Sequence, residues 1–332
     1  MLSRVADSVY WLGRYVERAE NVARFIDVNY NLTLGEIDSF NNQWSPLVYV
    51  SGDYKAFEEQ YGQATRENVL RFLTIDLANP NSIASCVAKA RENARTIRDI
   101  IPHAIWEQLN HFHLMVKAAA QTGSPIEETH EFCEQVRLAS HLFTGTSAAT
   151  MSHGEAWHFS QLGRLIERAD KTSRLIDVQY FVLLPEARDI GTPLDVVRWS
   201  ALLKSASALV MYRRVHGRIT PESVADFLIL NPNFPRSIQY CIFNAMQSMR
   251  RITGSASDSF SNASEQVTGR LGSKLTYTTI DEIIQQGLHE YVDQLQAQLN
   301  IIGEAIKADF FSRPATEFNA QATAVGQSQA AS

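Results

Sequence analysis

The stretch "LGRLIERADKTSRLIDVQY", residues 162–180, nearly repeats "LGRYVERAENVARFIDVNY", residues 12–30, which lies 150 residues earlier. The two copies are identical at 11 of 19 aligned positions. The identities include charged residues as well as apolar ones, namely Arg14/Arg164, Glu17/Glu167, Arg18/Arg168, Arg24/Arg174 and Asp27/Asp177. A packed apolar core does not by itself require matching charges. The repeat therefore points to charged groups that have a defined role.

The repeat extends through much of the chain at an offset of 155 residues. The stretch "TRENVLRFL" (65–73) aligns with "TPESVADFL" (220–228), and Trp44 aligns with Trp199. Further along, matching residues follow in the same order, with Ser82, Ile83, Cys86, Ala90, Arg95 and Ile97 aligned with Ser237, Ile238, Cys241, Ala245, Arg250 and Ile252. We interpret this pattern as a duplication that produced two related halves, about 1–150 and 151–312.

Apolar residues recur with the period of an α-helix almost throughout the chain. In the first copy, one stripe of the helical wheel comprises Leu12, Val16, Ala19, Ala23, Ile26 and Tyr30. Only "LVYV" (47–50) is a short strand candidate, and the Ser- and Gly-rich segment 254–274 predicts a long loop. We therefore predict an all-α protein. Residues 1–312 form a single large helical bundle of two pseudo-two-fold-related halves, and 313–332 form a disordered tail.

Composition narrows the classes of protein that fit this chain. Apolar residues make up 45% of the 332 residues and charged residues 20%, which is ordinary for a globular protein. The formal net charge is −6 without a run of Lys or Arg, so we expect no nucleic-acid partner. Three cysteines without a CxxC pair, and an N-terminus without an apolar signal region, predict a reduced, cytoplasmic protein. No apolar run approaches the roughly 20 residues of a membrane span, so we expect no membrane partner.

The repeated charges leave two structural alternatives open. In the first, the two helices lie close together and their Arg and Glu side chains form a structural lattice, because a buried charge must be paired. In the second, they line a polar pocket in which Arg18 and Arg168 clamp a carboxylate or phosphate. Glu17 and Glu167 would then hold an amine or a metal, and they are the catalytic candidates. The binding candidates within the two copies are Arg14, Arg18, Arg24, Asp27, Arg164, Arg168, Arg174 and Asp177.

A second group of polar residues occurs only in the first half. The stretch "ARENARTIRD" (90–99) places arginines at helical spacing, and "WEQLN" (106–110) follows closely. The matching stretch of the second half, "AMQSMRRIT", keeps only Arg250 in register. Either one half has kept a binding site, or this is an ordinary solvated helix face. The further binding candidates are Arg91, Asn93, Arg95, Trp106 and Asn110.

Motifs for metals and cofactors are weak in this sequence. Glu155 and His158 form one ExxH, but a di-iron bundle needs a second ExxH and two further carboxylates. The stretch "TGRLGSK" (268–274) lacks the spacing and the strand–helix context of a phosphate loop, and no GxSxG occurs. We therefore expect no metal and no bound cofactor.

The two Glu-Arg repeats, the "ARENARTIRD" and "WEQLN" block and the "FPRS" segment (234–237) together resemble the alpha-E family. This is an all-helical bacterial domain that is named for its Glu-Arg motif. The resemblance covers about residues 1–310, and its motif positions are Glu17, Arg18, Glu167 and Arg168. Family members are encoded beside circularly permuted ATP-grasp proteins and transglutaminase-like proteins. The resemblance thus implies partners of these two kinds and a role in forming amide or peptide bonds or in modifying peptides.

Two functions follow from the resemblance and the residues. In the first, the protein is an accessory subunit of an ATP-grasp ligase of the amidoligase type and binds a partner or a substrate, such as a peptide or an acidic small molecule. A chain without a phosphate loop or a nucleophile–base arrangement fits this function. In the second, it is a stand-alone enzyme that acts on amide or peptide substrates through the paired Glu-Arg core, with Glu17 or Glu167 as general base. The second function requires a carboxylate whose pKa is raised within a cavity.

Overall fold

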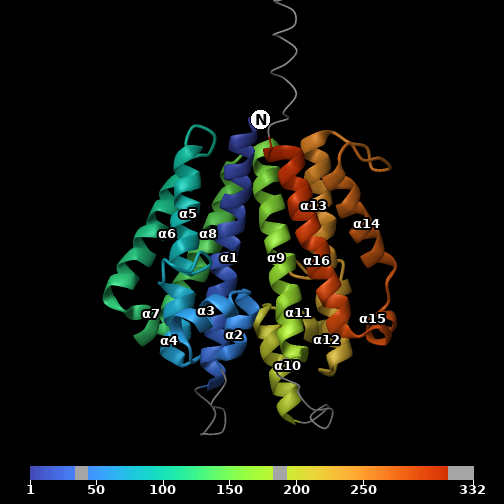
Figure 1. The fold of residues 1–332 in the computed structure, drawn as a ribbon. Coiled ribbons are helices and arrows are strands. Elements are labelled where there is room, and N and C mark those ends of the chain that lie inside the picture. Colours follow the sequence, from blue (N-terminus) through green and yellow to red (C-terminus); the bar gives the residue numbers. More distant parts are fainter. Residues whose placement is uncertain (34–43, 182–192, 313–332) are drawn as a thin grey trace, which may run out of the picture.

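The computed structural model describes residues 1–33, 44–181 and 193–312, and every regular element in these ranges is helical (Figure 1). The helices of the first half are α1 (Ser3–Thr33), α2 (Ser45–Ser51), α3 (Tyr54–Tyr61), α4 (Arg66–Thr74), α5 (Ile83–Thr96), α6 (His103–Thr122), α7 (Ser124–Glu127) and α8 (Thr129–Thr150). Those of the second half are α9 (Glu155–Phe181), α10 (Pro193–Ser205), α11 (Leu209–Val215), α12 (Pro221–Leu230), α13 (Ile238–Thr253), α14 (Ala263–Tyr277), α15 (Ile280–Gln286) and α16 (Leu288–Ile306). A short π-helical turn, η2 (Lys307–Phe311), follows α16. The prediction of an all-α fold is confirmed.

The two helices that carry the repeat, α1 and α9, lie side by side at the centre of the molecule (Figure 1). They are parallel, since the amino group of Met1 bonds to Glu155 at the start of α9 with an N–O distance of 2.8 Å, and Glu17 binds Arg168 further along both helices. Two matching glycines mark the closest approach of their backbones. A Cβ atom on Gly13 would lie 2.3 Å from the Ser160 carbonyl oxygen, and one on Gly163 would lie 2.1 Å from the Tyr10 carbonyl oxygen. Only glycine therefore permits this helix contact at either position.

The remaining helices are distributed on both sides of this central pair. Helix α1 packs against α5 and α8, and α9 packs against α13 and α16 (Figure 1). The helices follow one another in the same order in the two halves, with α4 and α12 beginning 155 residues apart, as do α5 and α13. These features accord with the duplication. The pseudo-two-fold relation of the complete halves stays a prediction.

Matching polar residues start matching helices. The hydroxyls of Ser82 and Ser237 accept bonds from the backbone N–H groups three residues on, which cap α5 and α13. Thr65 and Thr220 cap α4 and α12 in the same way. Each cap satisfies a backbone donor that lacks a partner inside its helix. The duplicated sequence thus encodes the helix starts as well as the packed faces.

The hydrophobic core crosses from one half to the other. One cluster joins Val9 and Leu12 of α1 to Leu162 and Ile166 of α9 and continues through the second half. A second cluster surrounds the later turns of α1, around Ile26, and is built mainly from the first half. The central helices are therefore buried on several sides, and charged residues along them lie among packed apolar side chains.

Two local predictions were wrong. The strand candidate 47–50 lies within α2, which has Pro46 in its first turn and is capped by Gly52 in the left-handed conformation. The predicted loop 254–274 is helical from Ala263 onward, because Asn262 caps α14 and the glycines of this helix fit against α13. The predicted tail 313–332 lies outside the described residues. Within the described ranges, each helix is too short or too polar to cross a membrane.

Candidate functional site

Each core glutamate accepts hydrogen bonds from an arginine of the other copy. Glu17 of α1 accepts from Nε and Nη2 of Arg168 at 2.8 and 2.7 Å. Glu167 of α9 accepts from Nε and Nη2 of Arg18 at 2.6 and 2.9 Å. The guanidinium fork matches the geometry of a carboxylate, so both pairs are bidentate. The predicted residues of the two copies are thus brought together reciprocally across the helix pair.

Additional cations hold both carboxylates in the charged form. Arg14 donates to Glu167 at 2.9 Å, and Arg236, in the loop before α13, donates to Glu17 at 3.1 Å. The side chains of Glu17 and Glu167 are only 2% and 0% exposed. Burial acts to raise the pKa of each carboxyl, but the neighbouring guanidinium groups outweigh it and hold both pKa values below the usual range. This arrangement favours the lattice alternative over an open pocket.

A second layer of ion pairs lies one turn further along each helix. Arg24 bonds to Glu20, and Arg236 donates to the same carboxylate at 2.6 Å. In the second copy, Arg174 donates to Asp170 at 3.0 Å. Arg24 also donates to the hydroxyl of Ser207, which lies in the turn between α10 and α11. These pairs extend the lattice toward the elements that surround the central helices.

The last predicted pair of acidic residues binds the outer helices. Asp27 lies 2.6 Å from Nδ1 of His130 and 3.2 Å from Arg137, both on α8. Asp177 lies 2.5 Å from Nδ1 of His289 on α16. Their contact with the carboxylates raises the pKa of both imidazoles. Asp27 and Asp177 thus anchor α8 and α16 to the central pair.

The two copies differ in which element supplies an additional cation to the cluster of charged side chains. Lys171 of α9 lies 3.4 Å from Asp170, whereas the matching residue of α1 is Asn21. Conversely, Arg236 donates to Asn21 at 2.8 Å, whereas its match in the first half is Asn81. One cluster therefore receives its additional cation from α9 and the other from the loop before α13. Sequence reasoning missed Arg236 as a site residue, although the alignment at the offset of 155 residues contains this exchange.

Arg164 is the exception among the predicted arginines. Its guanidinium donates to the side-chain oxygen of Gln161, and its Nε is buried without a hydrogen-bond partner. No carboxylate of the described residues lies within ion-pair distance of it, whereas the matching residue, Arg14, pairs with Glu167. Arg164 is therefore a cation that the lattice leaves unneutralised.

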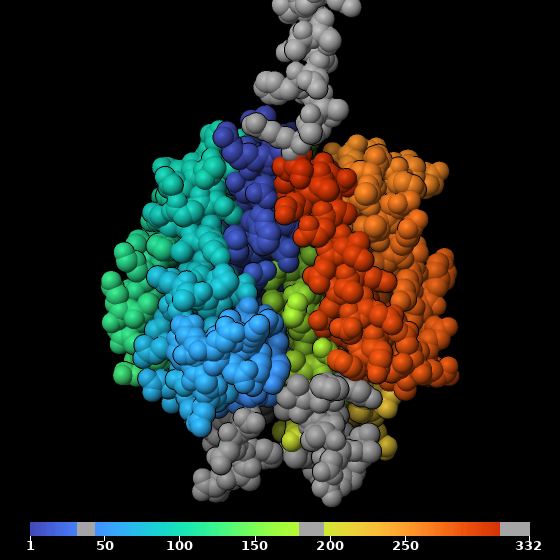
Figure 2. Space-filling model, viewed as in Figure 1, coloured from blue at the N-terminus to red at the C-terminus, as the bar shows by residue number. Residues whose placement is uncertain are grey.

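A groove of about 580 Å³ opens beside the lattice, between α1, α9 and α16. In Figure 2 the green surface of α9 is visible between blue α1 and red α16. The residues that line it are Asp7, Tyr10, Trp11, Arg14, Ile166, Asp170, Leu299, Asn300, Gly303, Glu304, Lys307, Phe311 and Ser312. Two of these, Lys307 and Phe311, belong to the π-helical turn η2. Such turns occur often at functional sites, which favours this groove as a candidate site.

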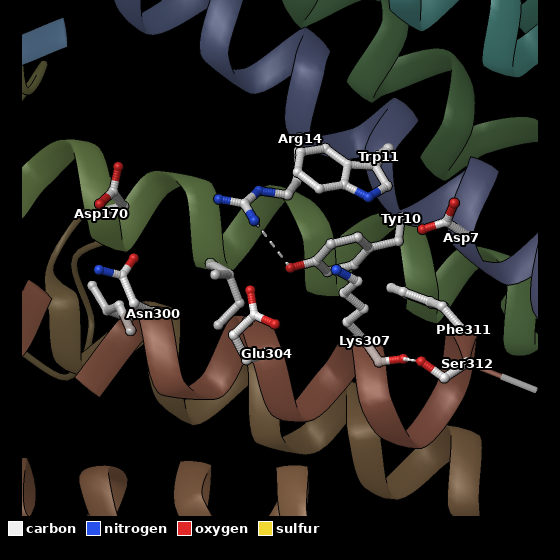
Figure 3. Close-up of a pocket in the computed structure, with 13 residues that line it drawn as sticks. Asp7, Tyr10, Trp11, Arg14, Asp170, Asn300, Glu304, Lys307, Phe311 and Ser312 are labelled. Atoms are coloured by element: carbon white, nitrogen blue, oxygen red, sulfur yellow. Dashed lines mark hydrogen bonds between the residues drawn. The ribbon is translucent and has the colours of Figure 1, made fainter. Parts of the chain in front are cut away.

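The groove combines aromatic surface with charges of both signs (Figure 3). The guanidinium of Arg14 lies over the Trp11 ring, 4.9 Å from its centroid, and donates to the hydroxyl of Tyr10 at 3.4 Å. Tyr10 in turn contacts Phe311 with ring centroids 5.2 Å apart. The pKa of Asp7 is raised by partial burial, although Trp11 and Lys307 oppose the shift. Arg14 joins the groove directly to the lattice, because it also binds Glu167.

The polar residues of the first half come together on the outer surface of α5 and α6. Arg91 donates to the side-chain oxygen of Asn110 at 2.9 Å, and its guanidinium lies 5.4 Å from the centroid of the Trp106 ring. Arg98 lies over the same ring at 4.8 Å. Arg95 is exposed and pairs with Glu92, and Asn93 lies beside them on α5. We call the surface formed by Arg91, Arg95, Arg98 and Trp106 the α5–α6 face; it lies apart from the Glu-Arg lattice.

The described residues contain no group of three or more His, Cys, Asp and Glu side chains arranged to hold a metal ion. Glu155 and His158 do not form part of such a group, since Glu155 binds the amino terminus. The three cysteines are buried, and burial raises the pKa of the Cys86 thiol to about 11 and that of Cys241 to about 12. These thiols are therefore uncharged at neutral pH and suited to packing rather than to nucleophilic attack.

Comparison with known proteins places this site in a family. Two uncharacterized proteins, one of Mycobacterium bovis and one of Mycobacterium tuberculosis, are each 21% identical over 318 residues, which cover 90% of this chain and 35% of the relative. The chain thus spans about a third of the length of the curated relatives it matches. No solved structure matches it. The model of the Alpha-E family, described as a predicted alpha-helical domain with a conserved ER motif, matches residues 1–311, and the chain therefore belongs to this family, with Glu17-Arg18 and Glu167-Arg168 as its two Glu-Arg pairs.

Proposed function

We propose that this protein is an accessory subunit that binds a substrate or a partner in an ATP-grasp-linked system for forming amide or peptide bonds or for modifying peptides. The observation that carries the proposal is the groove between α1, α9 and α16. It combines aromatic walls with acidic and basic side chains and lies against a rigid charged core. An amide or peptide ligand presents the same mixture of apolar surface, polar backbone and charge.

The groove offers a separate contact for each part of such a ligand. The rings of Trp11 and Phe311 provide apolar surface, and exposed Lys307 provides a cation for a carboxylate. Asp7 and Glu304 provide acceptors for an amine or for backbone N–H groups. Glu304 lies on α16 and Lys307 lies one turn later on η2, so the two residues present opposite charges side by side (Figure 3). A zwitterionic peptide segment fits this pattern best.

The lattice supports the groove and is not suited to act as a catalyst itself. Glu17 and Glu167 are buried, fully paired and held in the charged form, so neither combines an open position with a pKa near neutrality. Their role in this proposal is to fix α1 and α9 in register. Arg14 links the groove to these helices, because its guanidinium contacts both Glu167 of the lattice and Tyr10 of the groove.

The α5–α6 face is the surface that we assign to the ATP-grasp partner. Exposed Arg95 and Arg98 and half-buried Arg91 and Trp106 form a basic and aromatic patch, a composition that is enriched in protein interfaces. A transglutaminase-like protein is the second partner that we propose for the same system.

A first experiment tests the partner. The purified protein is mixed with a circularly permuted ATP-grasp protein from the same organism, and complex formation is followed by sedimentation velocity. We expect a complex that Arg91→Ala together with Arg98→Ala weakens at least tenfold. The matched control is Arg251→Ala, which removes an exposed arginine at the end of α13. Absence of a complex, or equal weakening by the control, would contradict the assignment of this face.

A second experiment tests the groove. Product formation by the ATP-grasp protein from amino acids or peptides is measured with and without this chain, and the chain alone is assayed with ATP. We expect the chain alone to be inactive and the reaction to depend on it. Trp11→Ala and Lys307→Ala should each raise the apparent KM for the peptide. If both variants support the reaction like the native chain, the groove does not bind the substrate.

A stand-alone enzyme is the second candidate, and one observation favours it. Asp7 is a groove carboxyl whose pKa is raised, mainly by burial, which is the direction of shift that a general base needs. In this case the purified chain would convert amide or peptide substrates without its partner, and Asp7→Asn would abolish that activity while leaving the thermal unfolding temperature unchanged. Activity of the chain alone that survives Asp7→Asn would exclude this carboxyl.

A further inference from the structure

A second cavity, of about 660 Å³, lies where α1, α8 and α9 meet two loops of the second half. Three guanidinium groups line it, those of Arg164, Arg168 and Arg236. The side chains of Ser207 and Phe234 close it from the turn after α10 and from the loop before α13. This cavity is separate from the groove between α1, α9 and α16, since no lining residue is shared.

The arginines of this cavity are not equally neutralised. Arg168 and Arg236 bind Glu17 and Glu20, and the remaining donor of Arg168, Nη1, reaches the carbonyl oxygen of Pro235 at 3.3 Å. Arg164, in contrast, bonds only to the neutral amide of Gln161 among the described residues. A partly buried guanidinium without a counterion loses hydration without gaining an ion pair. An anion in this cavity would therefore be stabilised more by Arg164 than by Arg168 or Arg236.

The charge cluster at this cavity has more positive charge than the matching cluster of the other copy. The cluster at the cavity contains four cations and two carboxylates, which are Arg24, Arg164, Arg168, Arg236, Glu17 and Glu20. The matching cluster contains four cations and three carboxylates, which are Arg14, Arg18, Lys171, Arg174, Glu167, Asp170 and Asp53. Asp53 has no acidic counterpart, because the residue 155 positions later is Ala208. The cluster at the cavity thus carries one more uncompensated positive charge.

The pKa values of the cavity arginines accord with this surplus. Burial, together with the nearby charge of Arg168, lowers the pKa of both Arg164 and Arg236. Arg14, the match of Arg164, has a raised pKa although burial opposes it, because Tyr10 and Glu167 favour its charged form. A bound anion would supply to Arg164 the stabilisation that Glu167 supplies to Arg14.

The backbone at the cavity is also unusual. Ser207 has a φ of 53°, in the left-handed region, and it is the only residue other than glycine with a positive φ in the described ranges. Its match 155 positions earlier is Gly52, which adopts the same region with a φ of 85°. The Ser207 hydroxyl accepts a bond from Arg24 and lines the cavity. Strain of this kind is concentrated at functional sites.

We propose that this cavity binds the oxyanion group of a small ligand, a carboxylate or a phosphate, with Arg164 as its principal cation and with the apolar part of the ligand against Met211 and Phe234. The planar guanidinium presents paired N–H donors to either oxyanion. Met211 and Phe234 add an apolar wall, and His141 adds an imidazole at the edge of the cavity. The proposal does not depend on the function proposed for the groove, because it rests on different residues.

Isothermal titration calorimetry of the full chain tests this proposal, in a buffer without phosphate and at fixed ionic strength. The probes are phenyl phosphate and phenylacetate, which share the ring and differ in the oxyanion. We expect saturable binding of at least one probe, and the tighter one identifies the oxyanion. Arg164→Gln should weaken it at least tenfold. Arg251→Gln, which removes one exposed positive charge at the far end of α13, should leave the affinity unchanged.

Thermal unfolding without ligand separates binding from structure. Arg164→Gln should leave the unfolding temperature unchanged or raise it, because the variant removes a partly buried cation without an ion-pair partner. Arg236→Gln should lower it, because Glu17 and Glu20 lose a partner. Three results would overturn the proposal: no saturable binding of either probe, equal weakening by Arg251→Gln, or a loss of stability in Arg164→Gln as large as in Arg236→Gln.

Discussion

At the scale of single residues, the duplicated Glu-Arg pair is explained by mutual neutralisation. Glu17 binds Arg168 and Glu167 binds Arg18, so each carboxylate depends on the copy that does not contain it. A buried ion pair contributes little compared with a well-packed apolar pair, but the removal of one partner leaves a charge that is costly to bury. This asymmetry explains why both halves keep the same charged residues.

The first prediction concerns Glu167. Glu167→Gln leaves Arg14 and Arg18 without a counterion in the interior, so the free energy of unfolding should fall by about 3–5 kcal/mol. Urea unfolding measures this change. The matched control is Glu58→Gln on exposed α3, which should change stability by less than about 0.5 kcal/mol. Similar stability of the two variants would show that Glu167 is not the centre of the lattice.

The second prediction concerns the histidines that contact Asp27 and Asp177. The folded-state pKa of His130 and His289 is raised, so their contribution is fully present below the unfolded pKa of about 6.5 and is lost as pH rises through the folded pKa. The thermal unfolding temperature should therefore decrease slightly between pH 6 and pH 8. The double variant His130→Gln, His289→Gln should lose this part of the pH dependence. An identical pH profile in the variant would show that these contacts do not couple to folding.

At the scale of elements, the central helix pair depends on two glycines. Gly13→Ala and Gly163→Ala each place a Cβ within about 2.3 Å of a carbonyl oxygen of the other helix, so α1 and α9 must move apart. We expect each variant to lose about 1–3 kcal/mol of unfolding free energy, although alanine favours a helix. Gly303→Ala on α16 meets no atom within 4 Å and should instead gain up to about 1 kcal/mol. Urea unfolding of the three variants compares them, and stabilisation by Gly13→Ala would rule out the close contact.

The sequence predicted most helices because period and caps act locally. The stripe of Leu12, Val16 and Ala19 and the caps at Ser82 and Ser237 are visible without any tertiary contact. The segment 254–274 could not be predicted in this way. Its glycines indicate a loop by composition, but Gly269 lies against Met246 and Gly272 against Ile242 of α13, and this packing makes α14 a helix. Such a contact is a property of the fold and not of the local sequence.

At the scale of the whole molecule, acid should unfold the protein through its core. The folded-state pKa values of Glu17, Glu20 and Glu167 are lowered by guanidinium groups that outweigh burial. Their contribution is therefore present above the unfolded pKa of about 4.3 and is lost as pH falls. The free energy of unfolding should fall steeply below pH 4.5, with net proton uptake on unfolding. Stability that is unchanged at pH 3.5 would contradict this account of the core.

The candidate site was predictable only in part. Matching charges in the two copies led directly to Glu17, Arg18, Glu167 and Arg168, because both members of each pair lie within the repeat. The groove was not predictable, since α1, α9 and α16 meet only in the folded chain. Arg236 was missed because it lies outside the opening repeat. It supplies to one cluster the additional cation that Lys171 supplies to the other. Repeats therefore reveal what the halves share, whereas the folded structure reveals where they differ.

The central claim is that α1 and α9 neutralise each other through buried Glu-Arg pairs, and a double-mutant cycle on Glu17 and Arg168 tests it most directly. The free energy of unfolding is measured for the native chain, Glu17→Gln, Arg168→Met and the double variant. We expect a coupling energy of about 1.5 kcal/mol or more, as for close, desolvated charge pairs. A coupling energy below about 0.5 kcal/mol, the value for residues that act independently, would contradict the account.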